Sequence, residues 1–410
     1  MTEFSDKVNI TICGGGNGAH TLAGISSLVP NACVTVVDVF ENEAERWTNA
    51  LANYGFTVRF SKDVMLHQKP GKVKFRVTND VESVVPHSDI LIICVPAYTH
   101  EIYLNLISPY VPETCPVVGM PGQPGFEYQA LTILQEHGRK CKVMSIETLP
   151  WACRISKYGQ EVDVVGTKEE VCYTLIDKLS KGNPSKRLDP VSVLQTILGK
   201  KPQLAKEENM LKYTFLCRPT IHPPIMYARW KNWDGKPLDK PPLFYQGVDE
   251  DSVRYMDGVT DESVKIAAAV TEIFPSMDFS GVSTMQEWLL DHYTDQITNK
   301  QTLLTCLQTN KAYDGLLHPT TKTADGKYVP DFTYRYIRED VPYGLIVVRQ
   351  IADFVGVETP VIDEIILWAQ EKLGKQFIQH GKLCKLDRTD GRLPMTYGIN
   401  TIEDFFNFFK

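Results

Sequence analysis

The first half of the chain alternates short β-branched runs with segments of helical period. Such runs predict strands, and they lie at residues 9–13, 34–40, 89–97, 116–121, 142–148 and 161–167. The segment at 42–55 predicts a helix and ends at Gly55, where a C-terminal cap belongs. Two further runs, 57–60 and 72–78, predict a hairpin inserted before the run at 89–97. Strands that alternate with helices favour a parallel sheet with right-handed crossovers.

The pattern changes after about residue 205, where apolar positions recur with the period of an α-helix. Amphipathic helices are predicted at 264–274, 284–297, 300–310 and 359–374. A chain of 410 residues also exceeds the usual size of one hydrophobic core. We therefore predict an α/β Rossmann domain with a doubly wound, mainly parallel sheet at 1–205, followed by an all-helical substrate and catalytic domain at 206–410.

Composition narrows the class of protein. The formal charge of −7 is spread along the chain without the basic stripe of a nucleic-acid binder. The longest apolar run, 90–98, is too short to cross a bilayer, and the N-terminus lacks the features of a signal peptide. Ten cysteines are scattered without metal-ligand spacing, so we expect reduced thiols and no metal site. We expect a cytoplasmic protein without a nucleic-acid or membrane partner.

A glycine-rich loop lies between the first predicted strand and a helix. It reads Gly14-Gly15-Gly16-Asn17-Gly18-Ala19 and fits the GxGxxA dinucleotide pattern. Gly14 permits a tight turn, Gly16 lets the backbone approach a pyrophosphate, and the small Ala19 lets the helix pack on the sheet. Asp38 closes the second strand, where a carboxylate accepts hydrogen bonds from the adenosine ribose and repels a 2′-phosphate. The loop predicts NAD(H) binding, although Asp38 alone could be a solvated acid at the end of a strand.

Pro96 ends the strand at 89–97, and ligands in open α/β sheets lie beyond the carboxyl ends of strands. We therefore expect Pro96 and the loop at 119–129 to line the nicotinamide end of the cofactor.

Acid–base chemistry has candidates in three clusters, at 145–154, 219–224 and 330–340. Pro223 and Pro224 fit the first turn of a helix, which places His222 at its N-terminus. A dehydrogenase needs a proton donor and acceptor, and a histidine held by a carboxylate such as Asp340 meets that need. On the residues alone, His222 could equally be structural and the loop around Asp340 a solvated surface.

Several longer strings resemble the invertebrate opine dehydrogenases, which include the octopine, alanopine, strombine and tauropine dehydrogenases. The strings are CGGGNGAH, AERWT, SxETLPWACRI, HP…RW, WDGKP…PLFYQG, LxHP, PDFxxRYxxEDxPxG and WAQEKxGK. They extend from residue 13 to about 375, so the resemblance covers nearly the whole chain.

The resemblance implies a reaction and a site. The family condenses pyruvate with the amino group of an amino acid and reduces the imine with NADH, which regenerates NAD in anaerobic glycolysis. It implies that His222 is the catalytic histidine and Asp340 its acidic partner, that Glu147 meets the amino acid, and that Arg335 reaches the cofactor and links its binding to domain closure. Further substrate positions implied by the motif match are Gln123, Thr148 and Trp288. The family also suggests a monomer.

Two other functions remain open at this stage. A simple 2-oxo acid or glycerol-phosphate type dehydrogenase would share the NAD-binding half, but it would reduce its substrate without an amine. A non-catalytic NADH sensor would keep the glycine loop and have no use for Glu147, His222 and Asp340.

Overall fold

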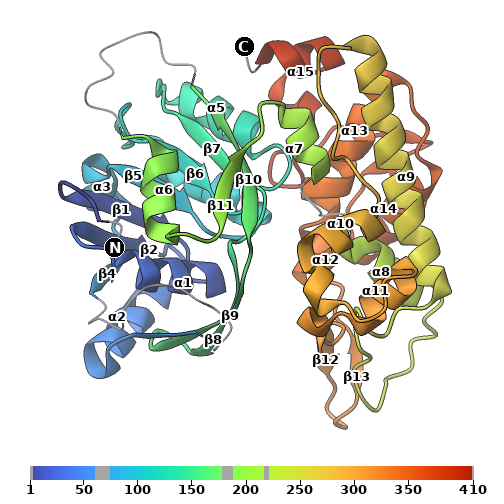
Figure 1. Cartoon of the computed structure of the whole chain (residues 1–410), viewed down its shortest axis with the longest axis horizontal. Helices are drawn as coiled ribbons and strands as arrows, with labels where there is room; N and C mark the ends of the chain where they lie inside the picture. Colours follow the sequence, from blue (N-terminus) through green and yellow to red (C-terminus); the bar gives the residue numbers. More distant parts are fainter. Residues whose placement is uncertain (1–2, 61–73, 178–187, 217–220, 409–410) are drawn as a thin grey trace. The chain divides into compact units, whose positions relative to one another are not determined.

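The structure is a computed structural model that describes residues 3–60, 74–177, 188–216 and 221–408 (Figure 1). The chain divides into two compact units: one extends to Tyr213, and the other spans Thr214–Phe408. The division expected after residue 205 falls within strand β11 (Gln203–Lys206) of the first unit. Each unit is described separately below.

The first unit is built on an eight-stranded sheet of order β11-β10-β7-β6-β5-β1-β2-β4. Besides β11, its strands are β1 (Val8–Cys13), β2 (Ala32–Val37), β4 (Phe75–Thr78), β5 (Ile90–Ile93), β6 (Val117–Gly119), β7 (Val143–Ile146) and β10 (Glu170–Ile176). The six strands from β4 to β7 all run parallel. Their order is that of a doubly wound dinucleotide-binding fold, so the predicted fold class of this half is confirmed. The antiparallel strand β10 at the β7 edge was not predicted.

Helices pack on this sheet in two sets. Their bounds are α1 (Asn17–Ser26), α2 (Glu43–Tyr54), α3 (Val81–Val84), α4 (His100–Ile107), α5 (Phe126–Glu136) and α6 (Pro190–Leu198), with 3-10 turns η1 (Val85–His87) and η2 (Ala97–Thr99). Helix α1 contacts α6, whereas α4 contacts both α3 and α5. The predicted cap of α2 is confirmed, because Gly55 has φ +70° and donates its N–H to the carbonyl of Leu51 at 2.9 Å.

The predicted hairpin at 57–60 and 72–78 is wrong in its pairing. Strand β3 (Thr57–Phe60) pairs in parallel with β9 (Glu161–Thr167), whereas β4 joins β2 in the main sheet. Residues 72–73 lie outside the described ranges. Strand β8 (Trp151–Lys157), which is not among the predicted strands, completes a separate three-stranded sheet with β3 and β9. A local alternation pattern predicts a strand but not its partner, which here is about a hundred residues away in the chain.

The second unit is mainly helical. Its elements are α8 (His222–Trp230), α9 (Glu250–Ile273), α10 (Met285–Tyr293), η4 (Thr294–Gln296), α11 (Leu303–Thr309), η5 (Lys311–Tyr313), α12 (Arg335–Arg338), the π-helix η6 (Val341–Leu345), α13 (Ile346–Val355), α14 (Pro360–Leu373), η7 (Pro394–Tyr397) and α15 (Ile402–Phe408). Helix α7 (Met210–Leu216) connects the two units. Small hairpins are formed by β12 (Thr320–Lys322) with β13 (Tyr328–Pro330) and by β14 (Ile378–Gln379) with β15 (Lys382–Leu383).

All four predicted helices of this unit are present. Helix α9 begins at Glu250, earlier than predicted, because Asp249 and Ser252 form a capping box at its N-terminus. Across the described ranges, no helix is both long enough and apolar enough to cross a membrane.

Candidate active site

The glycine loop has the geometry that a close-approaching ligand requires. Gly14 has φ +125°, and a Cβ at this position would lie 2.4 Å from Cγ1 of Val95. Gly16 is the N-cap of α1, and a Cβ there would meet nothing within 4 Å. Because Gly16 has no side chain, no side-chain hydrogen bond caps the helix, and the first turn of this ten-residue helix holds no acid. The loop therefore presents open space and the N–H groups of a helix start, the combination that binds a pyrophosphate.

The remaining loop residues hold the loop in place. Gly18 packs tightly, since a Cβ there would lie 2.8 Å from Sγ of Cys94. Ala19 is fully buried under the sheet, as its small size predicts. Asn17 was expected to contact the cofactor, and its Oδ1 accepts a hydrogen bond from the backbone N–H of Ile155 in β8 at 2.8 Å. Asn17 thus ties the loop to the second sheet.

Asp38 lies directly after β2 and is 2% exposed. Its Oδ2 faces Gly15 so closely that a Cβ on Gly15 would lie 1.9 Å away. Its Oδ1 accepts hydrogen bonds from the backbone N–H of Phe40 at 3.3 Å and from the hydroxyl of Tyr103 at 3.4 Å. Burial raises the pKa of this carboxyl group, and these hydrogen bonds oppose the rise. The acid is therefore held against the glycine loop, at the carboxyl end of β2.

Two more of the predicted residues lie in loops after β5 and β6, where these strands reach their carboxyl ends. Pro96 follows β5 and is partly exposed, and Gln123 lies in the loop after β6. Gln123 has φ +62°, a left-handed conformation that non-glycine residues seldom adopt and that is enriched at functional sites. The loop itself is tightly packed, because a Cβ on Gly122 would lie 1.9 Å from Oγ of Ser145.

Glu147 and Thr148 follow the carboxyl end of β7, which runs parallel to β6. Glu147 accepts a hydrogen bond from the backbone N–H of Cys172 through Oε1 at 3.0 Å. Lys168, which the sequence did not single out, donates to the carbonyl of Leu149 at 2.9 Å and to Oγ1 of Thr148 at 3.4 Å. Burial lowers the pKa of Lys168, and the charge of Glu147 opposes this effect. A partly buried lysine thus orders the turn that carries both predicted substrate residues.

In the second unit, His222 and Asp340 are in direct contact. His222 is the first residue of α8, and Pro223 and Pro224 form the first turn as predicted. The Nδ1 atom of His222 lies 2.6 Å from Oδ2 of Asp340, and both side chains are largely buried. An ionised Asp340 can only accept, so Nδ1 then carries the proton. Burial raises the pKa of Asp340 well above its ordinary value, and the positive charge of Arg335 opposes this rise. Asp340 directly precedes a π-helical turn, a distortion that frequently marks functional sites.

The surroundings of His222 favour the neutral imidazole. Burial is the main cause that lowers its pKa, and the positive charge of Arg335 lowers it further, whereas Glu339 acts in the opposite direction. Arg335 is about half exposed and lies 3.7 Å from Glu339. Its guanidinium group is thus anchored beside the histidine while one side remains open to solvent.

Aromatic rings surround the histidine. The ring of Tyr336 stacks on His222 with centroids 3.9 Å apart, and the hydroxyl of Tyr245 lies 2.8 Å from Nε2. Trp288, a predicted substrate residue, lies on α10 next to Tyr293, whose ring faces Tyr313 at 5.5 Å. The sequence did not reveal either contact of His222. Both tyrosines lie within the quoted motifs, but no periodicity marks them as neighbours of a histidine.

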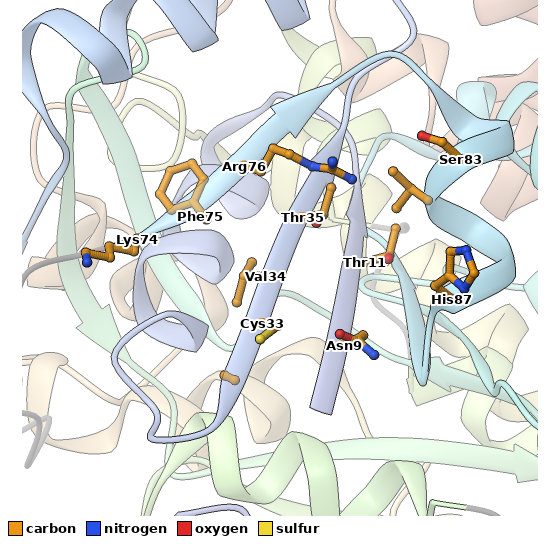
Figure 2. Close-up of a pocket in the computed structure, with 12 residues that line it drawn as sticks. Asn9, Thr11, Cys33, Val34, Thr35, Lys74, Phe75, Arg76, Ser83 and His87 are labelled. Carbon is orange, nitrogen blue, oxygen red and sulfur yellow. The ribbon is translucent and has the colours of Figure 1, made fainter. Parts of the chain in front are cut away.

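One hollow in the first unit lies away from these residues. It is a groove of about 610 Å³ over strands β1, β2 and β4, and Figure 2 shows Thr11, Thr35 and Arg76 pointing into it. None of the predicted site residues lines it. The described residues hold no cluster of three or more metal-ligating side chains. The nine cysteines within the described ranges are all free thiols.

Comparison with known proteins identifies the family. The profile of the NAD/NADP octopine/nopaline dehydrogenase α-helical domain matches residues 207–373. The chain is 42% identical to the opine dehydrogenase of Haliotis discus hannai, across 98% of this chain and all of that one. It is also 42% identical to the tauropine dehydrogenase of Arabella iricolor, across 97% and 99% of the two chains.

Solved structures agree with this assignment. A structure of octopine dehydrogenase with NADH and L-arginine is 38% identical, with a TM-score of 0.87 across 98% of this chain and 99% of that one. A D-mandelate dehydrogenase, at 13% identity and a TM-score of 0.54, shares the fold alone. On these similarities, which extend over both units, the chain belongs to the opine dehydrogenase family.

Proposed function

We propose that His222 and Asp340 perform the acid–base steps of the opine dehydrogenase reaction in this chain. The enzyme is an NAD(H)-dependent oxidoreductase acting on CH–NH groups: it condenses pyruvate with the amino group of an amino acid and reduces the resulting imine. The observation that supports the assignment of roles is the 2.6 Å contact between His222 Nδ1 and Asp340 Oδ2. It gives a histidine with a fixed tautomer and a charge partner.

The residues of the first unit are suited to hold the cofactor. NADH, when bound, supplies the hydride that reduces the imine. The open space at Gly16 and the N–H groups at the start of α1 would take the pyrophosphate, and Asp38 would take the adenosine ribose. Pro96 would lie on the nicotinamide side. Arg335, whose side chain is about half exposed, is the further residue proposed to bind the cofactor.

His222 moves the protons. An amino acid arrives as an ammonium ion, so a base must remove one proton before the nitrogen can attack the keto carbon of pyruvate. His222, held neutral by its surroundings, takes that proton and becomes an imidazolium stabilised by Asp340. It then returns the proton to the carbinolamine hydroxyl, which leaves as water when the imine forms.

Four residues are proposed to bind the amino acid. Glu147 supplies a carboxylate that attracts a cationic group, and Lys168 keeps its turn in place. Gln123 and Thr148 follow the carboxyl ends of β6 and β7 and offer an amide and a hydroxyl group. Trp288 supplies an apolar ring from α10.

Steady-state kinetics test this proposal directly. NADH oxidation is measured with pyruvate alone and then with arginine, alanine, glycine, β-alanine or taurine added singly. We expect one amine to be required, and we expect His222→Ala to lower kcat by at least about a hundredfold while NADH binding persists. Near-normal turnover of the variant would refute the role of His222. Oxidation with pyruvate alone would instead favour a simple 2-oxo acid reductase.

We also propose that the enzyme acts as a cytoplasmic monomer and regenerates NAD when glycolysis runs without oxygen. The resemblance to the invertebrate enzymes supports this setting. Size-exclusion chromatography with light scattering tests the monomer, and cell fractionation tests the location.

A further inference from the structure

Both ring nitrogens of His222 are engaged within the second unit. Nδ1 faces Asp340 at 2.6 Å, and Nε2 lies 2.8 Å from the hydroxyl oxygen of Tyr245. Because Nδ1 carries the imidazole proton, Nε2 is an acceptor and the Tyr245 hydroxyl is its donor. The nitrogen that must act as the base is therefore already occupied by a phenol.

The ring of Tyr245 is held firmly. Tyr245 is 7% exposed, stacks on Tyr313 with centroids 4.0 Å apart, and meets Phe244 edge-on at 4.8 Å. Tyr313 in turn faces Tyr293 at 5.5 Å. Moving Tyr245 away to free Nε2 would break these contacts and leave a cavity, at a cost typical of disrupting a packed aromatic site.

We infer that the Tyr245 hydroxyl relays the proton between the substrate and Nε2 of His222. This inference rests on the proposed role of His222. It assigns to the reaction a third residue, which forms a hydrogen-bonded series Asp340–His222–Tyr245.

The relay balances without ionising the phenol. The substrate ammonium gives a proton to the Tyr245 oxygen while the hydroxyl proton passes to Nε2. The amine is then neutral, Tyr245 is again a phenol, and His222 is an imidazolium paired with Asp340. Running the two transfers in reverse protonates the carbinolamine hydroxyl. Burial raises the pKa of Tyr245 well above its ordinary value, so the phenol stays protonated between transfers and does not act as a phenolate base.

The test compares Tyr245→Phe with Tyr313→Phe. The first variant keeps the buried ring and removes only the hydroxyl at Nε2, whereas the second removes a hydroxyl from the ring stacked on it, away from His222. We expect Tyr245→Phe to lower kcat about a hundredfold, with the NADH dissociation constant unchanged, and Tyr313→Phe to lower it less than about fivefold. If the hydroxyl is only a displaceable cap, Tyr245→Phe will be as active as the wild type or more so, and the relay is overturned.

Two further readouts separate a relay from a structural role. When two protons move in the rate-limiting transition state, the rate depends on the fraction of D2O along a curve. This dependence should become linear in Tyr245→Phe. A dependence that is equally curved in the variant would contradict the inference. Comparison with His222→Ala separates the two proposals: activity in that variant refutes the role of His222 itself, whereas loss of activity there combined with full activity in Tyr245→Phe refutes only the relay.

Discussion

Replacing Asp340 with asparagine tests the charge that supports His222. The amide oxygen of asparagine can still accept from Nδ1–H, so the tautomer and the 2.6 Å contact can persist while the negative charge is removed. Two unit charges about 4 Å apart interact by about 4 kcal/mol at an effective dielectric constant of about 20. Both side chains are mostly buried, with 14% of His222 and 4% of Asp340 exposed, so water screens the pair only weakly.

That energy sets the size of the kinetic effect. Since about 1.4 kcal/mol corresponds to a factor of ten in rate, we expect Asp340→Asn to lower kcat by about two to three orders of magnitude. The pH profile of kcat/KM tests the direction of the change in the pKa of His222. Without the carboxylate, the imidazolium is less stable and the pKa of His222 falls, so the acidic limb of kcat/KM should move to lower pH. The assay is NADH oxidation with pyruvate and the accepted amino acid across the pH range.

Glu339→Gln is the matched control. Glu339 is a neighbouring buried carboxylate at 2% exposure that pairs with Arg335 at 3.7 Å. The negative charge of Glu339 raises the pKa of His222, but the 2.6 Å contact with the imidazole is made by Asp340. We expect this control to lower kcat less than about tenfold, because the charge acts over a longer distance. Equal effects of the two substitutions, or an acidic limb that moves to higher pH in Asp340→Asn, would refute the reasoning.

The cofactor loop gives two further predictions. Gly16→Val should lower the free energy of unfolding by only about 1 kcal/mol, because its Cβ meets nothing within 4 Å and only the preference of the N-cap for glycine is lost. The same variant should raise the NADH dissociation constant at least about tenfold. Gly14→Val should lower the free energy of unfolding by about 2–4 kcal/mol, because Gly14 has φ +125° and a Cβ there would lie 2.4 Å from Cγ1 of Val95. Thermal melts without nucleotide and NADH fluorescence titrations separate the two effects, and similar melts for both variants would contradict the assignment. Asp38→Ser should reduce the preference for NADH over NADPH at least about tenfold, because the carboxylate that repels a 2′-phosphate is removed; an unchanged ratio of kcat/KM for the two cofactors would exclude this role.

The sequence predicted those features that depend on neighbouring residues. Strands β1, β2 and β5 are apolar runs, and the glycine loop needs only a positive φ at Gly14 and space at Gly16, which residue type controls directly. The start of α8 was predictable for the same reason, because prolines favour the first turn of a helix.

Features that depend on distant pairing were not predictable in this way. The β3–β9 pair joins Thr57 to Glu161, and β8 folds on β9 although its sequence runs directly on from the loop after β7. Lys168 escaped notice because its role is defined by a carbonyl and a hydroxyl group about twenty residues earlier in the chain. Only the folded sheets bring these groups together.

The two partners of His222 act on its protonation in opposite directions. Asp340 accepts from Nδ1 and favours the charged imidazolium, whereas Tyr245 donates to Nε2 and favours the neutral ring. Removing the tyrosine hydroxyl should therefore move the acidic limb of kcat/KM to higher pH, opposite to the shift expected for Asp340→Asn. The surroundings of His222 favour the neutral ring, and the contact with Asp340 stabilises the imidazolium once it forms, so one residue can both take and return a proton in one turnover. If Tyr245→Phe instead moves the limb to lower pH, the Tyr245 hydroxyl is an acceptor, and the proton starts each cycle on Nε2.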